Sequence, residues 1–457
     1  MSKAINSQPL ETLTQQLDQG ATTSVELVED ALARSKDPSG QGPRVYTQLF
    51  ETQALNAARA SDLLRAAGLK RSMIEGIVVA VKDLFDVAGH VTRAGSVILA
   101  DQPPALHDAD VVARLRAAGA IVLGTTNMTE FAYSGLGINP HYGTPLGPFD
   151  RSAGRIPGGS SSGAGVAVSD GMASVSIATD TGGSIRIPAA FCGLTGFKPT
   201  AHRISQKGLM PLSTSLDAVG PLAHRVTCCA WLDAVMRAEP ISTLTPKSIS
   251  SLILAKPNQI VFENIEPIVE QTFTHACEVL QQAGARIIEL DVPEFSEWLS
   301  IHAGNGLATA EAWAWHQRLI ATQVDRYDPR VSSRLLEGKH ILASTYIDAL
   351  ASRKDWINRL NARIQSFDAL IYPTVPIIPP LLAPLIESDE QYKLINSLVL
   401  RNTALINYLN GCSLSIPCHV PDQAPVGLML SASAGQDDSL LQTGLACEHA
   451  LNRARGI

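Results

Sequence analysis

Three short stretches of the sequence have residues that could do chemistry: one places a lysine after an apolar run, and two place serines among glycines. They are "VAVKDLFD" around Lys82, "PGGSSSGAG" around Ser160 to Ser162, and "TDTGGSIR" around Ser184. A serine hydroxyl becomes a strong nucleophile only when a base takes its proton, and a lysine is such a base only when it is kept neutral. Lys82 follows an apolar run that predicts a buried strand, so burial can desolvate its amine. Each stretch alone fits an ordinary turn or strand end, but together they indicate nucleophilic catalysis.

The stretch "TDTGGSIRIPAA", residues 179–190, places a threonine and two glycines directly before Ser184. Glycine lets the backbone turn several N–H groups toward one point, and such a group of donors stabilises the oxyanion that forms at an attacked carbonyl. Arg186 and Pro188 follow, and a proline near the first turn predicts that a helix begins here. The guanidinium of Arg186 is then available to hold a loop or a carboxylate.

These stretches together resemble the amidase signature family. The glycine-serine stretch is followed, 24 residues after Ser160, by "TDTGGSIRIPAAFCGLTGFKPT", which is similar to the central signature of that family. The similarity extends upstream through "GIVVAVKDLFDVAGHVTRAGS" and "LRAAGAIVLGTTNMTEFAYSG". Downstream it includes "SLDAVGPLAHRV", "FDALIYPT" and "APVGLML", so that it covers the chain from about Thr23 to Glu448.

The resemblance implies a Ser-Ser-Lys catalytic triad. Ser184 is then the nucleophile, Ser160 the bridging serine that follows a cis peptide bond from Gly159, and Lys82 the base that receives the proton. Ser184 attacks an amide carbonyl, and water later releases the acid from the acyl-enzyme. The oxyanion hole is expected to use the backbone N–H groups of Thr181, Gly182, Gly183 and Ser184.

Other residues match family positions that surround the site. Hydrogen-bonding support is expected from Ser161, Asp180 and Arg186. By similarity the acyl pocket is bordered by Met128, Thr129, Glu130 and Phe131, although core packing is an alternative role for the methionine and the phenylalanine. Any part in substrate specificity is left open for Trp313, Trp315 and Arg401.

Helical and strand patterns alternate along the chain. Residues 108–128 predict a helix, a glycine stop and a strand, and residues 161–180 predict a helix of small residues and another strand. This alternation favours an α/β fold with a central mixed, largely parallel sheet covered by helices on both faces, as in the amidase signature fold. We expect a single amidase domain over residues 1–457, with a helical lead-in over 1–70 and a more variable region over about 235–365.

The lead-in itself predicts two helices within residues 9–35, separated at Gly20. Thr23 or Ser24, followed by an acidic residue in the first turn, is typical of a helix cap, so the second helix is expected to begin there.

Composition excludes several classes of protein. The chain of 457 residues has a formal net charge of −7 without a basic cluster, so a nucleic-acid partner is not expected. Its first residues lack the pattern of a signal peptide, and no apolar run reaches the length of a membrane span. The seven cysteines offer neither a disulfide framework nor zinc spacing. We expect a cytoplasmic enzyme without metal or organic cofactor that acts on a small-molecule amide; a homodimer stays open.

Two alternatives remain at the level of sequence. Residues 159–163 also satisfy G-x-S-x-G, the pattern of an α/β-hydrolase, with Ser161 as nucleophile and with His202, His224 or His316 as base. The second alternative is a glutaminase-type subunit of an amidotransferase complex, whose catalytic core would look the same and whose ammonia passes to a partner.

Overall fold

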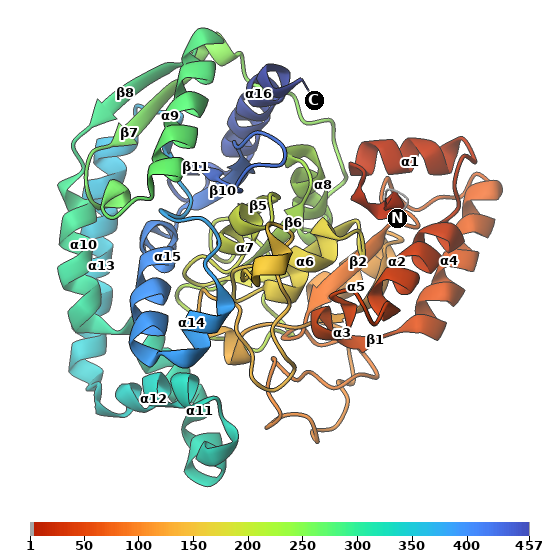
Figure 1. The fold of residues 1–457 in the computed structure, drawn as a ribbon, viewed down its shortest axis with the longest axis horizontal. Coiled ribbons are helices and arrows are strands. Elements are labelled where there is room, and N and C mark those ends of the chain that lie inside the picture. Colours follow the sequence, from red (N-terminus) through yellow and green to blue (C-terminus); the bar gives the residue numbers. More distant parts are fainter. Residues whose placement is uncertain (1–3, 457) are drawn as a thin grey trace.

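The computed structural model describes residues 4–456, without the side chains of residues 300 and 302–305. Within this range eleven strands form one sheet in the order β1-β3-β2-β4-β6-β5-β10-β11-β9-β7-β8 (Figure 1). The strands are β1 (Tyr46–Leu49), β2 (Val78–Lys82), β3 (Ile121–Thr126), β4 (Val175–Asp180), β5 (Thr195–Lys198), β6 (Ala218–Ala223), β7 (Ile253–Pro257), β8 (Arg286–Leu290), β9 (Ala369–Pro373), β10 (Cys412–Pro417) and β11 (Gly427–Ala432).

Helices flank this sheet. In chain order they are α1 (Leu10–Asp18), α2 (Ser24–Lys36), α3 (Gly42–Val45), α4 (Glu51–Ala66), α5 (Asp110–Ala117), α6 (Ser162–Ser169), α7 (Arg186–Phe191), α8 (Val226–Met236), α9 (Pro267–Gln282), α10 (Pro293–Asn305), α11 (Leu307–Gln323), α12 (Pro329–Glu337), α13 (Ala343–Ile364), α14 (Leu382–Glu387), α15 (Asp389–Leu409) and α16 (Asp437–Arg455). Helices α6, α7 and α15 pack together as one group, and α8, α9 and α16 as another.

The expected mixed sheet between helices is confirmed. Its parallel pairs are confined to two blocks, β3-β2-β4 and β9-β7-β8, whereas the other neighbouring pairs among the described strands are antiparallel. The sheet is therefore less parallel than the helix–strand alternation indicated. Loops without a crossover helix, 199–217 and 418–426, join β5 to β6 and β10 to β11, and only antiparallel neighbours can be joined in that way.

The N-terminal lead-in follows its sequence signals. Helix α2 begins with a capping box in which the Thr23 hydroxyl accepts from the backbone N–H of Glu26, and the Glu26 carboxylate accepts from the backbone N–H of Thr23. The lead-in expected over 1–70 also includes one strand. Strand β1 pairs antiparallel with β3 at the sheet edge, and its four residues are too few to give a periodic signal.

Two parallel strands bring the chemistry-bearing stretches together. Strands β2 and β4 are neighbours, so their carboxyl ends, at Lys82 and Asp180, lie at the same edge of the sheet. Helix α6 packs against both strands, and the small residues of α6 permit that contact. A Cβ on Gly163 would lie 2.5 Å from the carbonyl oxygen of Val45, which leaves no room for a side chain. Within residues 4–456, no helix combines the length and apolar character needed to cross a membrane.

Candidate active site

Lys82 is the last residue of β2, and its side chain is fully buried. Its Nζ lies 2.8 Å from Ser160 Oγ and 2.9 Å from Thr179 Oγ1, and it donates to both hydroxyls. Burial lowers the pKa of Lys82 to about 7, although the carboxylates of Asp217 and Asp180 act in the opposite direction. A substantial fraction of this amine is therefore neutral near pH 7, as a general base requires.

Ser160 begins the turn that leads into α6. The peptide bond between Gly159 and Ser160 is cis, which confirms the geometry expected from the resemblance. The Ser160 carbonyl accepts from the backbone N–H of Thr129 at 3.0 Å, and this contact fixes the turn. Among the described residues no hydrogen bond joins Ser160 to Ser184. Of the two contacts that the expected relay needs, the structure therefore shows the one between Ser160 and Lys82.

The neighbouring serines have no such contacts. The hydroxyls of Ser161 and Ser162 are buried without a hydrogen-bond partner in the described part of the chain. The expected support from the Ser161 side chain is therefore not formed. None of the three histidines considered as its base forms a hydrogen bond to Ser161 in the described part of the chain. His316 Nδ1 lies 2.9 Å from the Tyr327 hydroxyl, whereas His202 and His224 line other cavities.

The loop from Thr181 to Ser184 connects β4 to α7. None of its four backbone N–H groups donates to an acceptor within residues 4–456. Gly183 adopts a φ of +140°, and a Cβ there would lie 2.2 Å from Thr403 Oγ1, so glycine is required for both its conformation and its surroundings. The Thr181 hydroxyl donates to Asp217 at 2.5 Å, while burial raises the pKa of Asp217 to about 6. The loop thus presents unpaired N–H donors on a fixed backbone.

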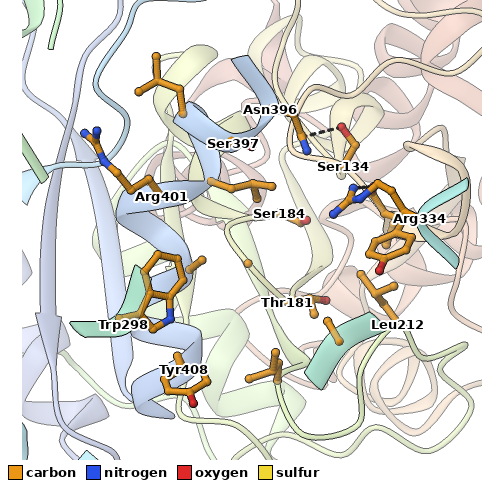
Figure 2. Close-up of a pocket in the computed structure, with 18 of the residues that line it drawn as sticks. Ser134, Thr181, Ser184, Leu212, Trp298, Arg334, Asn396, Ser397, Arg401 and Tyr408 are labelled. Carbon is orange, nitrogen blue, oxygen red and sulfur yellow. Dashed lines mark hydrogen bonds between the residues drawn. The ribbon is translucent and has the colours of Figure 1, made fainter. Parts of the chain in front are cut away.

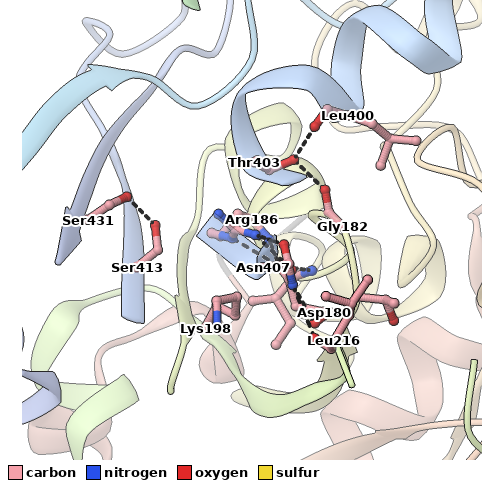
Figure 3. Close-up of polar contacts among 12 residues, drawn as sticks. Asp180, Gly182, Arg186, Lys198, Leu216, Leu400, Thr403, Asn407, Ser413 and Ser431 are labelled. Carbon is pink, nitrogen blue, oxygen red and sulfur yellow. Dashed lines mark hydrogen bonds and ion pairs between the residues drawn. The ribbon is translucent and has the colours of Figure 1, made fainter. Parts of the chain in front are cut away.

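A buried polar network holds this loop from behind (Figure 3). Asp180 and Arg186 form an ion pair at 2.8 Å with both side chains fully buried, and Asp180 also accepts from the backbone N–H of Ile185 at 3.0 Å. Burial acts to raise the pKa of Asp180, but Arg186, Lys198 and the hydrogen bond from Asn407 together outweigh it and lower that pKa to about 2. The support expected from Asp180 and Arg186 is therefore formed.

Helix α15 completes the network. Asn407 donates to the carbonyl of Asp180 at 2.9 Å, and its side-chain oxygen accepts from Arg186 at 2.6 Å. Thr403 Oγ1 donates to the carbonyl of Gly182 at 2.6 Å. Sequence reasoning missed both α15 residues because they lie more than 200 positions beyond the loop and belong to no local motif. Thr179 and Asp217 were missed although they lie within matched stretches.

A cavity of about 510 Å³ opens at the Ser184 side of this loop (Figure 2). Its volume is in the range of small-molecule sites. It is lined by Ala132, Tyr133, Ser134, Thr181, Gly182, Ser184, Leu212, Leu216, Trp298, Leu299, Ala308, Arg334, Leu394, Asn396, Ser397, Leu398, Leu400, Arg401, Ala404 and Tyr408. Arg401, left open by the sequence, therefore borders the cavity, whereas Trp313 and Trp315 do not.

The stretch expected to border the acyl pocket, Met128 to Phe131, lies behind the cavity wall. Glu130 is buried and accepts from Ser96 Oγ at 2.7 Å and from the backbone N–H of Asp328 at 2.7 Å, and it pairs with His141. Phe131 packs edge-on against His316. The lining starts with the next residue, Ala132, which is as deeply buried as Phe131.

Comparisons with known proteins identify the family of this chain. The model of the family described as Amidase matches residues 26–441. A protein named 2-amino-5-chloromuconic acid deaminase, from Comamonas testosteroni, is 34% identical over 415 residues, 89% of this chain and 88% of that protein. A glutamyl-tRNA(Gln) amidotransferase subunit from Thermobifida fusca is 33% identical, over 94% of this chain and 93% of that one.

The likeness extends to three dimensions. A solved structure described as the crystal structure of an amidase superposes with a TM-score of 0.87 at 30% sequence identity, and the match covers 97% of this chain and 99% of that one. The chain therefore belongs to the Amidase family, whose members are hydrolases that act on amide C–N bonds.

Proposed function

We propose that this chain hydrolyses a small or medium carboxylic amide to an acid and ammonia or an amine, through an acyl-enzyme on Ser184. The observation that carries the proposal is the buried 2.8 Å contact between Lys82 Nζ and Ser160 Oγ, at the same edge of the sheet as the Ser184 loop. A buried lysine with a lowered pKa beside a serine has the properties of a general base for proton removal.

The first half of the reaction forms the acyl-enzyme. Neutral Lys82 accepts the Ser160 proton as Ser160 accepts the Ser184 proton, and Ser184 Oγ forms a bond to the amide carbonyl carbon. The unpaired N–H groups of residues 181–184 stabilise the resulting oxyanion, and one such donor contributes about 3 kcal/mol. The C–N bond then breaks, and the relay returns its proton to the leaving nitrogen. The proton transfer from Ser184 to Ser160 needs these hydroxyls to approach each other, and such contacts often tighten only with substrate.

The second half releases the acid. Water gives a proton to the same relay and attacks the acyl carbon, so that Ser184 leaves with its proton restored. No step needs a group other than the side chains and backbone of this chain and water. Ser161 and Ser162 take no part in this scheme, because their hydroxyls have no partners in the described part of the chain.

Replacement of the nucleophile tests the proposal directly. Ser184→Ala is expected to abolish ammonia release from a panel of aryl, aliphatic and peptide amides while the protein still folds, because a hydroxyl on a loop contributes little to stability. Ser162→Ala is the matched control and is expected to keep near-normal turnover. Phenylmethylsulfonyl fluoride should modify Ser184, as read by peptide mass spectrometry. Normal turnover by folded Ser184→Ala would sink the assignment.

A second candidate function is that of a glutaminase-type subunit. It is favoured by the 33% identity with the amidotransferase protein of Thermobifida fusca, which covers nearly the whole of both chains. Ammonia release by the isolated chain separates the two candidates. A free amidase turns over alone, whereas a member of a complex is expected to release ammonia efficiently only with a co-purified partner.

A further inference from the structure

The cavity beside Ser184 carries positive charge without a compensating carboxylate. Arg334 and Arg401 line it, and no aspartate or glutamate is found among the lining residues that the structure describes. Its polar surface otherwise comes from hydroxyls and amides, whereas much of the rest is contributed by leucine and alanine. A cation that is withdrawn from water needs hydrogen-bond acceptors, which the chain or a bound ligand supplies.

The two arginines differ in what they bind. Arg401 donates to the carbonyl oxygens of Glu263 at 2.7 Å and Val261 at 3.3 Å, and Figure 2 shows its guanidinium pointing away from Ser184. This side chain therefore connects α15 to the segment that follows β7. It serves the fold, and it is not available to a molecule inside the cavity.

Arg334 is available. Its Nη1 donates to the carbonyl of Tyr133 at 2.5 Å, and its guanidinium lies 4.1 Å from the centre of the Tyr133 ring. These two contacts fix its direction from α12 into the cavity, toward Ser184 (Figure 2). Within residues 4–456, Arg334 forms no ion pair, and its Nε and Nη2 donate to no acceptor. The guanidinium edge formed by Nε and Nη2 is therefore free, and it has the geometry that binds a carboxylate through two parallel hydrogen bonds.

Asn396 adds a donor on the same side of the cavity. Its Oδ1 accepts from Ser134 Oγ and from the backbone N–H of Gly135, both at 2.9 Å, and these two bonds determine which way the amide is turned. Its Nδ2 is left without an acceptor in the described part of the chain and points into the cavity (Figure 2). Trp298 lies on the opposite side of the cavity (Figure 2).

We propose that the substrate is an amide that also bears a carboxylate, and that Arg334 and Asn396 bind this carboxylate while Ser184 attacks the amide. The inference rests on the proposed function, because it names the class of amide. Arg334 discriminates against neutral amides, because a neutral amide leaves the guanidinium of Arg334 in the cavity without a hydrogen-bonded anion.

Matched substrates test the proposal. The probes are succinamic, glutaramic and adipamic acid, each beside the alkyl amide that has a methyl group in place of the carboxylate. The wild-type protein is expected to favour at least one acid over its neutral partner by roughly 30-fold in kcat/KM, the effect of a charge-assisted hydrogen-bonded pair. Arg334→Gln should remove this preference by slowing only the acid, with the neutral amide within about threefold of wild type.

Control variants separate binding from folding. Arg330→Gln, one helical turn earlier on α12, removes a partly buried arginine that pairs with Asp389 and packs on Tyr392 outside the cavity lining, and it should change the turnover of neither substrate. Arg334→Lys keeps the charge without the fork, and an intermediate preference is expected even if Arg334→Gln folds poorly. Equal losses on both substrates in folded Arg334→Gln, or a wild-type protein without preference for the acids, would overturn the inference.

Failure of the proposed function gives a different result. If no amide is hydrolysed, calorimetric titration of the Ser184→Ala protein with glutaramic acid and with pentanamide still measures recognition of the carboxylate. Tighter binding of the acid that is lost in the Ser184→Ala, Arg334→Gln double variant supports the carboxylate site. Equal binding of the two probes contradicts it.

Discussion

The hydroxyl of Thr403 donates a 2.6 Å hydrogen bond to the carbonyl oxygen of Gly182, a residue 221 positions earlier in the chain. Thr403 belongs to α15, and Gly182 belongs to the loop that presents its N–H groups beside Ser184 (Figure 3). Because a peptide unit is planar, fixing the Gly182 carbonyl also fixes the direction of the next N–H, that of Gly183. Thr403 is thus a positioning residue for the proposed oxyanion hole.

Thr403→Val, which keeps the shape but removes the hydroxyl, is expected to lower kcat about tenfold with KM within about twofold, because oxyanion stabilisation acts in the transition state. Steady-state kinetics with a good substrate measure the separate effects on kcat and KM. Thr443→Val is the control, since that hydroxyl bonds only the Ser439 carbonyl within α16. A rise in KM alone would assign Thr403 to substrate binding instead.

The pH dependence of the reaction should report Lys82. The base must be neutral, and burial lowers the pKa of Lys82 to about 7, so kcat/KM should fall as pH drops below that value. The negative charge of Asp217 opposes this lowering. Asp217→Asn should therefore shift the fall of kcat/KM on the acid side of the pH profile, its acid limb, to lower pH. A limb that moves to higher pH in this variant would contradict the electrostatic relationship.

Lys82→Arg should lose several orders of magnitude in turnover, because arginine stays charged and cannot accept the Ser160 proton. The circular dichroism spectrum and thermal midpoint identify folded protein. Near-normal activity in this variant would mean that the cation acts by its charge and not as a base.

Asp180→Asn should reduce the free energy of unfolding. The folded-state pKa of Asp180, about 2, lies below its usual 3.8, so the carboxylate contributes stability that is present above pH 3.8 and lost as pH falls toward 2. The shift corresponds to about 2 kcal/mol. Urea unfolding near pH 7 and near pH 3 should show a smaller difference between variant and wild type at the lower pH. An unchanged difference would assign the loss to packing.

Local signals predicted those parts of the molecule that depend on neighbours in sequence. Helix α2 has its cap at Thr23, α7 has a proline in its first turn, and β2 is a continuous apolar run that ends at Lys82. The cis bond before Ser160 and the contact of that serine with Lys82 were predicted because the signature stretches are long and specific.

Parts that depend on distant contacts were not predicted. Strand β5 is four residues long and includes a glycine, so no period identifies it, and the antiparallel centre of the sheet follows from loop connections that leave no compositional trace. The same holds for the cavity. Arg334 reads as one more charge on an amphipathic helix, and only the packing of α12 beside Tyr133 turns it toward Ser184.

The residues that line the cavity are unevenly distributed along the sequence. The proposed proton relay and oxyanion loop come from residues 82–184, whereas most of the wall opposite them comes from residues 298–408, which Figure 1 shows in green to blue on the other side of the molecule. Most of the residues that shape the cavity therefore come from a different part of the polypeptide than the proposed relay, although Thr403 and Asn407 of α15 also hold the oxyanion loop. A mutagenesis library restricted to the cavity-lining residues of α12 and α15, which do not include Thr403 and Asn407, would vary which amide is accepted while the relay and the supports of its oxyanion loop keep their identity. Substitutions at these lining positions can likewise change substrate preference between relatives while every intermediate sequence keeps its catalytic residues.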